Sequence, residues 1–176
     1  MNIRRNRTRI TTAAATGLVA ALAIAGLSAA TASAAPAKAQ KIVTCTPANT
    51  KTVLSSRPAG HLLIKSTNKG KTPCYAYGAP LIGFDHPQST VQINEDSVPQ
   101  AVVTLDPGQS AYAGVRTYGA GDSGHYAKQM SLSFEGRAMA GSVGPSASFK
   151  VPAKTWVNDN AAVTYWQTTQ SDALHW

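Results

Sequence analysis

The segment Gly121-Asp122-Ser123-Gly124-His125 contains residue types that nucleophilic catalysis uses. A serine hydroxyl becomes a nucleophile when a histidine takes its proton, and a buried aspartate must orient that histidine. Ser123 could act with His125 or with His61, as in a small serine hydrolase. The same residues also suit a glycine-rich loop between two strands, and a secreted protease inhibitor could present such a loop, residues 119–125, to an enzyme.

The wider context of this segment argues against catalysis. The segment is similar to the Gly-Asp-Ser-Gly-Gly sequence at the nucleophile of trypsin-like proteases, but His125 replaces the last glycine. Neither His61 nor His86 lies in the Ala-His-Cys context of that family. The glycines also have the spacing of a dinucleotide-binding loop, which must precede a helix, whereas Gln129–Phe134 alternates like a strand. We therefore predict no catalytic residues, no cofactor and no enzymatic activity.

Metal sites have little support in the sequence. The histidines are scattered, at His61, His86, His125 and His175, without the spacing of a zinc site. The acidic turns at residues 94–96 and 158–160 lack the alternating carboxylates of a strong calcium loop. Nothing singles out Glu95 and Glu135 as a glycosidase pair. We expect no bound metal.

The two cysteines, Cys45 and Cys74, both lie beyond the N-terminal segment described below. In an exported protein an isolated pair without Cys-x-x-Cys spacing is most simply a disulfide. We predict that these residues form one structural bridge.

Aromatic residues gather near the C-terminus and could form a contact surface. In Ala161–Thr168, Val163 and Tyr165 share one face of the expected strand, and Thr164 and Trp166 share the other. One of the two faces belongs to the core, so the other is free to bind a partner. Trp156, Tyr165 and Trp166 are the residues that we assign to this possible binding surface.

The elements that must position these residues are short strands. Runs rich in β-branched and aromatic residues are separated by Gly, Pro, Asn and Asp, as is typical of an antiparallel β-sandwich. The runs are Lys41–Thr46, His61–Thr67, Cys74–Tyr77, Leu81–His86, Thr90–Ile93, Ala101–Leu105, Ser110–Tyr118, Gln129–Phe134, Ser148–Val151 and Ala161–Thr168. The best helix is the short segment Thr168–Leu174. The fold class is therefore all-β, an immunoglobulin-like sandwich with one disulfide.

The N-terminus has the pattern of an export signal. The chain has 176 residues, with 16 Lys and Arg against 8 Asp and Glu. Four of the arginines precede the apolar run Ile10–Leu27, and Ala32-Ser33-Ala34 suits signal peptidase. We predict a signal peptide at residues 1–34, a flexible lead-in at 35–43 and one sandwich domain at 44–176. The protein is then secreted, without a membrane segment after cleavage.

Basic residues are concentrated in the first part of the expected mature chain. Residues 35–75 contain seven Lys or Arg and no acid, but no aromatic residue lies among them before Tyr75. A nucleic-acid site has a denser basic stripe with stacking aromatics. We expect no nucleic-acid binding and a solvated basic face, and contact with an anionic envelope polymer remains an alternative.

An ordered set of motifs carries a family resemblance. Cys45-Thr46 is followed by Leu62–Asn68, Cys74, the Gly78-Ala79-Pro80 corner and the Leu105-Asp106-Pro107-Gly108 turn. Over about residues 44–150 this resembles the domain-of-unknown-function family four-two-three-two, small exported β-sandwich domains of actinobacteria. The resemblance implies export and a β-sandwich, and it implies no activity.

These observations predict a secreted, non-catalytic extracellular module. We expect it to be a monomer that binds an as yet unknown protein or envelope polymer, or that associates with the cell envelope. The alternatives are the protease inhibitor and, with less support, the serine hydrolase described above.

Overall fold

The computed structural model describes residues 41–85, 87–121 and 123–176. The expected signal peptide and residues 35–40 of the lead-in lie outside these residues. Most of the described chain consists of short strands. In chain order they are β1 (Val43–Thr44), β2 (Thr50–Arg57), β3 (His61–Asn68), β4 (Cys74–Phe84), β5 (Gln92–Asn94), β6 (Val103–Leu105), β7 (Ser110–Arg116), β8 (His125–Tyr126), β9 (Gln129–Glu135), β10 (Ser142–Lys150), β11 (Trp156–Val157) and β12 (Ala162–Thr164). Two single-turn 3-10 helices (Glu95–Ser97 and Arg137–Met139) and the short helix α1 (Gln170–Ala173) complete the set.

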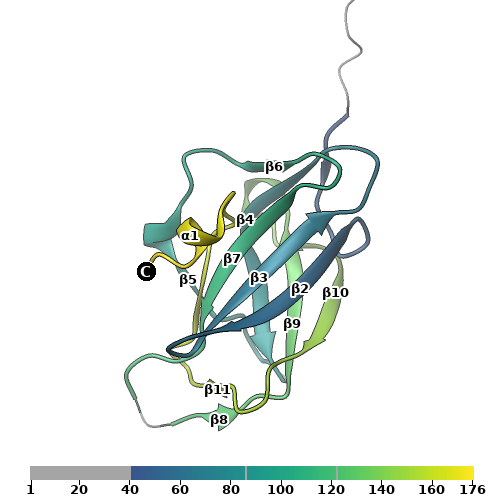
Figure 1. Ribbon diagram of the computed structural model, residues 1–176. Coiled ribbons are helices and arrows are strands. Elements are labelled where there is room, and N and C mark those ends of the chain that lie inside the picture. The colour runs from purple at the N-terminus through teal and green to yellow at the C-terminus, as the bar shows by residue number, and fades with distance from the viewer. Residues whose placement is uncertain (1–40, 86, 122) are drawn as a thin grey trace, which may run out of the picture. The chain divides into compact units, whose positions relative to one another are not determined.

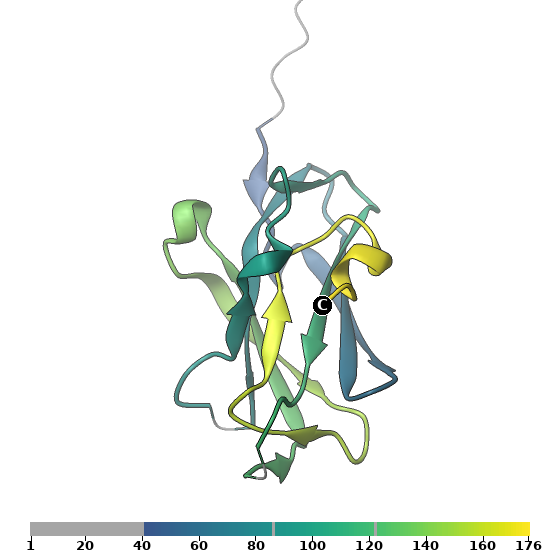
Figure 2. The ribbon, with the colours of Figure 1, turned by 90° about the vertical axis from the view of Figure 1, so that its left-hand side faces the viewer.

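The strands form two packed sheets and a small ribbon (Figures 1 and 2). One sheet has the order β1-β4-β9-β10, with β6 also paired to β4, and the other has the order β2-β3-β7-β12-β5. The ribbon, β8 with β11, lies at the end of the sandwich opposite β6 (Figure 1). The predicted all-β fold with multiple sheets and one disulfide is confirmed. Within the described ranges, no helix has the length and apolar character needed to cross a membrane.

The pairing is not purely antiparallel, which corrects one expectation. β1 runs parallel to β4, and β5 runs parallel to β12. Parallel neighbours need a long crossover connection. For β1 and β4 that connection is the β2–β3 hairpin, which belongs to the other sheet.

The predicted disulfide is present. Cys45 and Cys74 are bonded, are 29 residues apart in sequence, and are both fully buried. The Cys45 N–H donates to the carbonyl of Tyr75 at 2.8 Å. The bridge therefore fastens the short strand β1 onto the start of β4.

The core lies between the sheets and follows the period-two pattern of the strands. On β9, Met130, Leu132 and Phe134 are fully buried, as the alternation of this segment predicts. The Phe134 ring stacks on Trp166, with centroids 5.1 Å apart and planes 13° apart. Because Trp166 follows β12 of the other sheet, this stack joins the two layers.

Strand β4 is continuous, although the sequence predicts two strands here, separated at Gly78-Ala79-Pro80. The register with β9 shifts between Tyr77 and Leu81, so these three residues form a bulge. Gly78 has φ of 54°, and a Cβ there would lie 1.8 Å from Oε2 of the buried Glu135. The same oxygen accepts from the Ala79 N–H at 3.4 Å. Glycine is required here because a side chain would displace that carboxylate.

Candidate functional site

The β8–β11 ribbon separates two hollows at the same end of the sandwich. Its two cross-strand pairs are Tyr126 with Trp156 and His125 with Val157. Successive residues of a strand point to opposite faces. The Tyr126–Trp156 pair accordingly lines one hollow, and the His125–Val157 pair lines the other.

The first of these, the aromatic hollow, lies between the β2–β3 turn, the end of β7 and the ribbon. Its volume is about 340 Å³, and its main side chains are Arg57, Tyr118, Tyr126, Lys154 and Trp156. Tyr126 and Trp156 meet edge to face with centroids 5.1 Å apart, and Tyr126 is 62% exposed. An aromatic side chain with this much exposed surface is a common feature of contact sites.

The backbone around the aromatic hollow is shaped to hold its walls. Gly60 has φ of 71°, and a Cβ there would lie 2.1 Å from Cε1 of Tyr118. The turn therefore needs glycine both for its conformation and for the close approach of the Tyr118 ring. Lys154 on the opposite rim has φ of 64°, in the left-handed region that non-glycine residues rarely adopt. Backbone strain of this kind is concentrated at functional sites.

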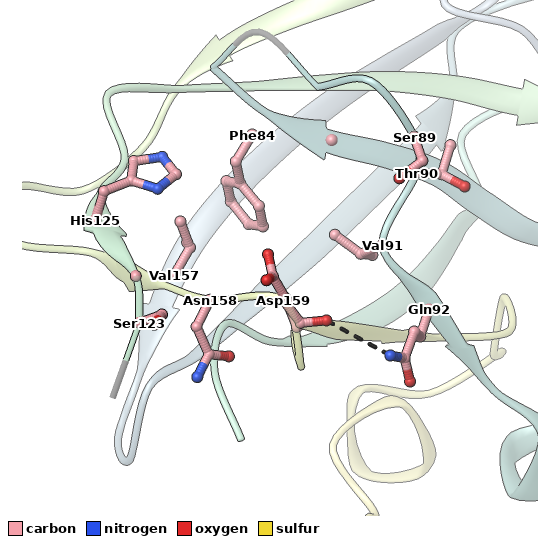
Figure 3. A pocket seen from close by; sticks show the side chains of 13 residues that line it. Phe84, Ser89, Thr90, Val91, Gln92, Ser123, His125, Val157, Asn158 and Asp159 are labelled. Carbon is pink, nitrogen blue, oxygen red and sulfur yellow. Dashed lines mark hydrogen bonds between the residues drawn. The ribbon is translucent and has the colours of Figure 1, made fainter. Parts of the chain in front are cut away.

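The second, the polar hollow, has an apolar floor and a hydrophilic rim (Figure 3). Its volume is about 580 Å³. Phe84 and Val157 form part of the floor, and Ser123, His125 and Asp159 stand on the rim. The arrangement offers hydroxyl, imidazole and carboxylate groups around a small apolar surface.

Asp85 joins the polar hollow to the sheet below it. Its Oδ2 lies 2.8 Å from Nε2 of His125, and its Oδ1 accepts from the N–H groups of Lys128 and Gln129 at 2.9 and 3.0 Å. The Lys128 N–H is the main cause of the lowered pKa of Asp85; burial opposes it, and the Gln129 N–H and His125 lower the pKa further. Asp85 therefore fixes the start of β9 as well as the ribbon.

The residues of the possible hydrolase are only partly brought together. Ser123 and His125 line the same hollow, with Asp85 bonded to His125. Among the described residues, no hydrogen bond joins Ser123 to His125, and His61 lines the other hollow. The His125 and Asp85 side chains are 57% and 27% exposed, so neither has the buried environment of a catalytic pair. Asp122 and His86 lie outside the described residues.

The glycine-rich segment is fastened by asparagines of a neighbouring loop. Oδ1 of Asn158 accepts from the Gly119 N–H at 3.1 Å, and its Nδ2 donates to the Gly119 carbonyl at 3.2 Å. Asn160 donates to the carbonyl of Ala120. The backbone of residues 119–121 is therefore already occupied by contacts within the domain.

Two of the three aromatic residues predicted to lie on the surface are buried. Tyr165 and Trp166 are only 5% and 0% exposed, so their assignment to a binding surface is wrong. β12 ends at Thr164. The Trp166 N–H then donates to the Gly78 carbonyl of the opposite sheet, and Gln167 pairs with Tyr112 of β7. The Tyr165 hydroxyl donates to Oε2 of Glu95 at 2.8 Å, which, with burial, raises the pKa of Tyr165. Trp156 is half-buried and lines the aromatic hollow.

Some of the side chains considered as metal ligands make other contacts. Within residues 41–85, 87–121 and 123–176, no three His, Cys, Asp or Glu side chains gather as a ligand set. Glu95 accepts from Tyr165, and Asn158 holds Gly119.

Comparison with known proteins identifies a family for this chain. Residues 43–167 match the family model described as Domain of unknown function (DUF4232). The chain belongs to this family. The match begins at the first residue of β1 and ends before α1, so the two sheets and both hollows lie within the DUF4232 domain. No curated protein and no solved structure matches the chain.

Sequence reasoning missed most of the residues that form the aromatic hollow. Arg57, Tyr118, Tyr126 and Lys154 come from four separate segments, and each looks like an ordinary surface residue. The sequence carried no usable signal for the Tyr126–Trp156 pair, because each residue lies on a strand of only two residues, which is too short to show a periodic pattern.

Proposed function

We propose that this chain is an exported, non-catalytic binding module that holds an extracellular protein or a cell-envelope polymer. The pair of exposed Tyr126 and half-buried Trp156, which lines the aromatic hollow, carries this proposal. Partly exposed aromatic residues in a preformed hollow supply a large contact area at a small entropic cost. The disulfide and the leader-like N-terminus support export.

Retention by the cell envelope and by immobilised culture proteins tests the proposal. The protein is expressed from the full-length chain, and its retention is compared with that of Tyr126→Ala and Tyr75→Ala. Tyr75 is the control because it is a half-buried tyrosine on β4, a strand of the sheet that does not border the aromatic hollow. We expect retention that Tyr126→Ala abolishes and Tyr75→Ala leaves intact. If neither fraction retains the protein, or if both variants behave alike, the proposal is wrong.

A serine hydrolase at the polar hollow is the second candidate, because Ser123 and His125 line this hollow and Asp85 is hydrogen-bonded to His125. A fluorophosphonate probe separates the two proposals: labelling that Ser123→Ala removes would establish the hydrolase, and an unlabelled protein dismisses it.

The third alternative, a protease inhibitor presenting residues 119–125, predicts slower cleavage by at least one serine protease in a panel. Unchanged rates dismiss it.

A further inference from the structure

Three adjacent strands of one sheet form a surface of a single charge sign. Strands β2, β3 and β7 contain Lys51, Arg57, Lys65 and Arg116, and they contain no Asp or Glu. Their register places Arg57, His61 and Arg116 side by side in one row. Helix α1, which packs over Gly114 of β7, contributes one acid, Asp172, whose carboxylate is bonded to the Thr169 hydroxyl.

This row of basic residues runs into the aromatic hollow. Arg57 and His61 line the hollow, and Lys154 stands on its rim. None of the residues that line the hollow is acidic. Arg116 lies under the ring of Trp176, 5.2 Å from its centroid, so it adds charge close to the surface but offers less of its own contact area. A ligand that enters the hollow therefore meets positive charge on one side and aromatic rings on the other.

The shape of the hollow suits a ring-shaped ligand. Tyr118 is held against Gly60, and Tyr126 is braced by Trp156, so the aromatic walls are preformed. The volume of about 340 Å³ is near the lower end of small-molecule sites, which are about 300–1,000 Å³. The C–H faces of a sugar ring pack on aromatic rings, and Arg and Lys recognise carboxylate and phosphate groups.

We propose that the aromatic hollow binds a sugar unit of an anionic polysaccharide or glycopolymer, whose acid groups lie on Arg57, Lys154 and the basic row beside them. This inference rests on the proposed function and specifies its ligand. A repeating anion is favoured because the basic residues extend along three strands beyond the hollow, where a single small acid could not reach them. An acidic peptide has the same negative charge but no sugar rings, and the experiment includes one for that reason.

The inference is tested by measuring the binding of defined polymers to the full chain by calorimetry. The probes are polygalacturonate, a phosphodiester-linked wall glycopolymer, neutral dextran and polyglutamate. We expect binding of at least one of the first two, weakening as salt rises because the ionic contacts are exposed. The carboxylate and phosphate polymers distinguish the two sources of negative charge.

Matched variants locate the binding. Truncation of a central aromatic contact usually costs more than about 1 kcal/mol, so Tyr126→Ala should weaken binding roughly tenfold. Arg57→Gln and Lys154→Gln should weaken it several-fold and reduce its salt dependence. Tyr75→Ala and Lys150→Gln, on the other sheet, should change the affinity less than about twofold, as expected for sites outside the contact. Near-ultraviolet circular dichroism checks that each variant is folded. We expect Tyr126→Ala to fold, because the Tyr126 side chain is 62% exposed.

The outcomes separate this inference from the proposed function. Envelope retention that depends on Tyr126, without binding of either anionic polymer, overturns the inference and leaves the proposed function intact. Equal binding of dextran or of polyglutamate also overturns it, because charge and ring would then not both be required. Absence of retention by both the envelope and the culture-protein fractions overturns the proposed function.

Discussion

Removing the disulfide should cost a large part of the stability of this domain. The perturbation is the double variant Cys45→Ala with Cys74→Ala. The bridge closes a loop of 29 residues. The chain-entropy model gives about 12 cal/mol/K for a loop of that length, or about 3.6 kcal/mol at 25 °C. Because both cysteines are fully buried, lost packing adds to this value. The total free energy of unfolding of a small domain is only about 5–15 kcal/mol.

Urea unfolding, with tryptophan fluorescence as the signal, measures this loss. The double variant should lose at least about 3 kcal/mol, and its m-value should rise because an unbridged denatured chain exposes more surface. Val43→Ala is the control, since it weakens the packing of β1 and keeps the bridge. A loss below about 1 kcal/mol with an unchanged m-value would refute the argument that the bridge acts by restricting the denatured chain.

Four further variants test individual contacts. Gly78→Ala should destabilise by more than about 3 kcal/mol, because left-handed strain adds to a clash with the carboxylate behind it, whereas Gly108→Ala, with open space around it, should cost about 1 kcal/mol in thermal unfolding. Equal losses at the two glycines would contradict this. Tyr165→Phe removes the bond to Glu95 and should cost about 1.5 kcal/mol in the same assay, and a neutral effect would show that the bond adds nothing. The lowered pKa of Asp85 means that its stabilisation is present above the ordinary value of 3.8 and is lost as pH falls through the lower folded value. Urea unfolding from pH 6 to 2 should show this acid-dependent loss in the wild type and a smaller one in Asp85→Asn; parallel curves would contradict it.

The fold class was predictable because several strands alternate between apolar and polar residues, which indicates their buried faces. Gln129–Phe134 alternates strictly, and its three apolar side chains are fully buried. Thr50–Arg57 was missed because Val53 and Leu54 are adjacent and break the alternation. This strand lies at a sheet edge and is specified by its eight backbone register pairs with β3, which no side-chain pattern reveals.

The site was less predictable than the fold. Tyr126 and Trp156 become neighbours only because two strands of two residues each pair across 30 positions of sequence. Tyr165 and Trp166 illustrate the opposite error, since an alternating pattern implies an inner and an outer face only while the strand continues. Here the strand ends at Thr164, and both rings are buried in the core.

The free edge of β2 governs how two copies of this domain could meet. No strand in the described part of the chain pairs with its outer side, so alternate residues of this eight-residue strand offer unpaired N–H and C=O groups there. A second copy joining this edge in the antiparallel sense would bring Lys51 of one molecule towards Arg57 of the other at both ends of the new ladder. Like charges facing across strands oppose pairing, so the same residues that could attract an acidic polymer would also keep the domains apart. Neutralising that charge, by ligand or by salt, would remove the barrier to self-association.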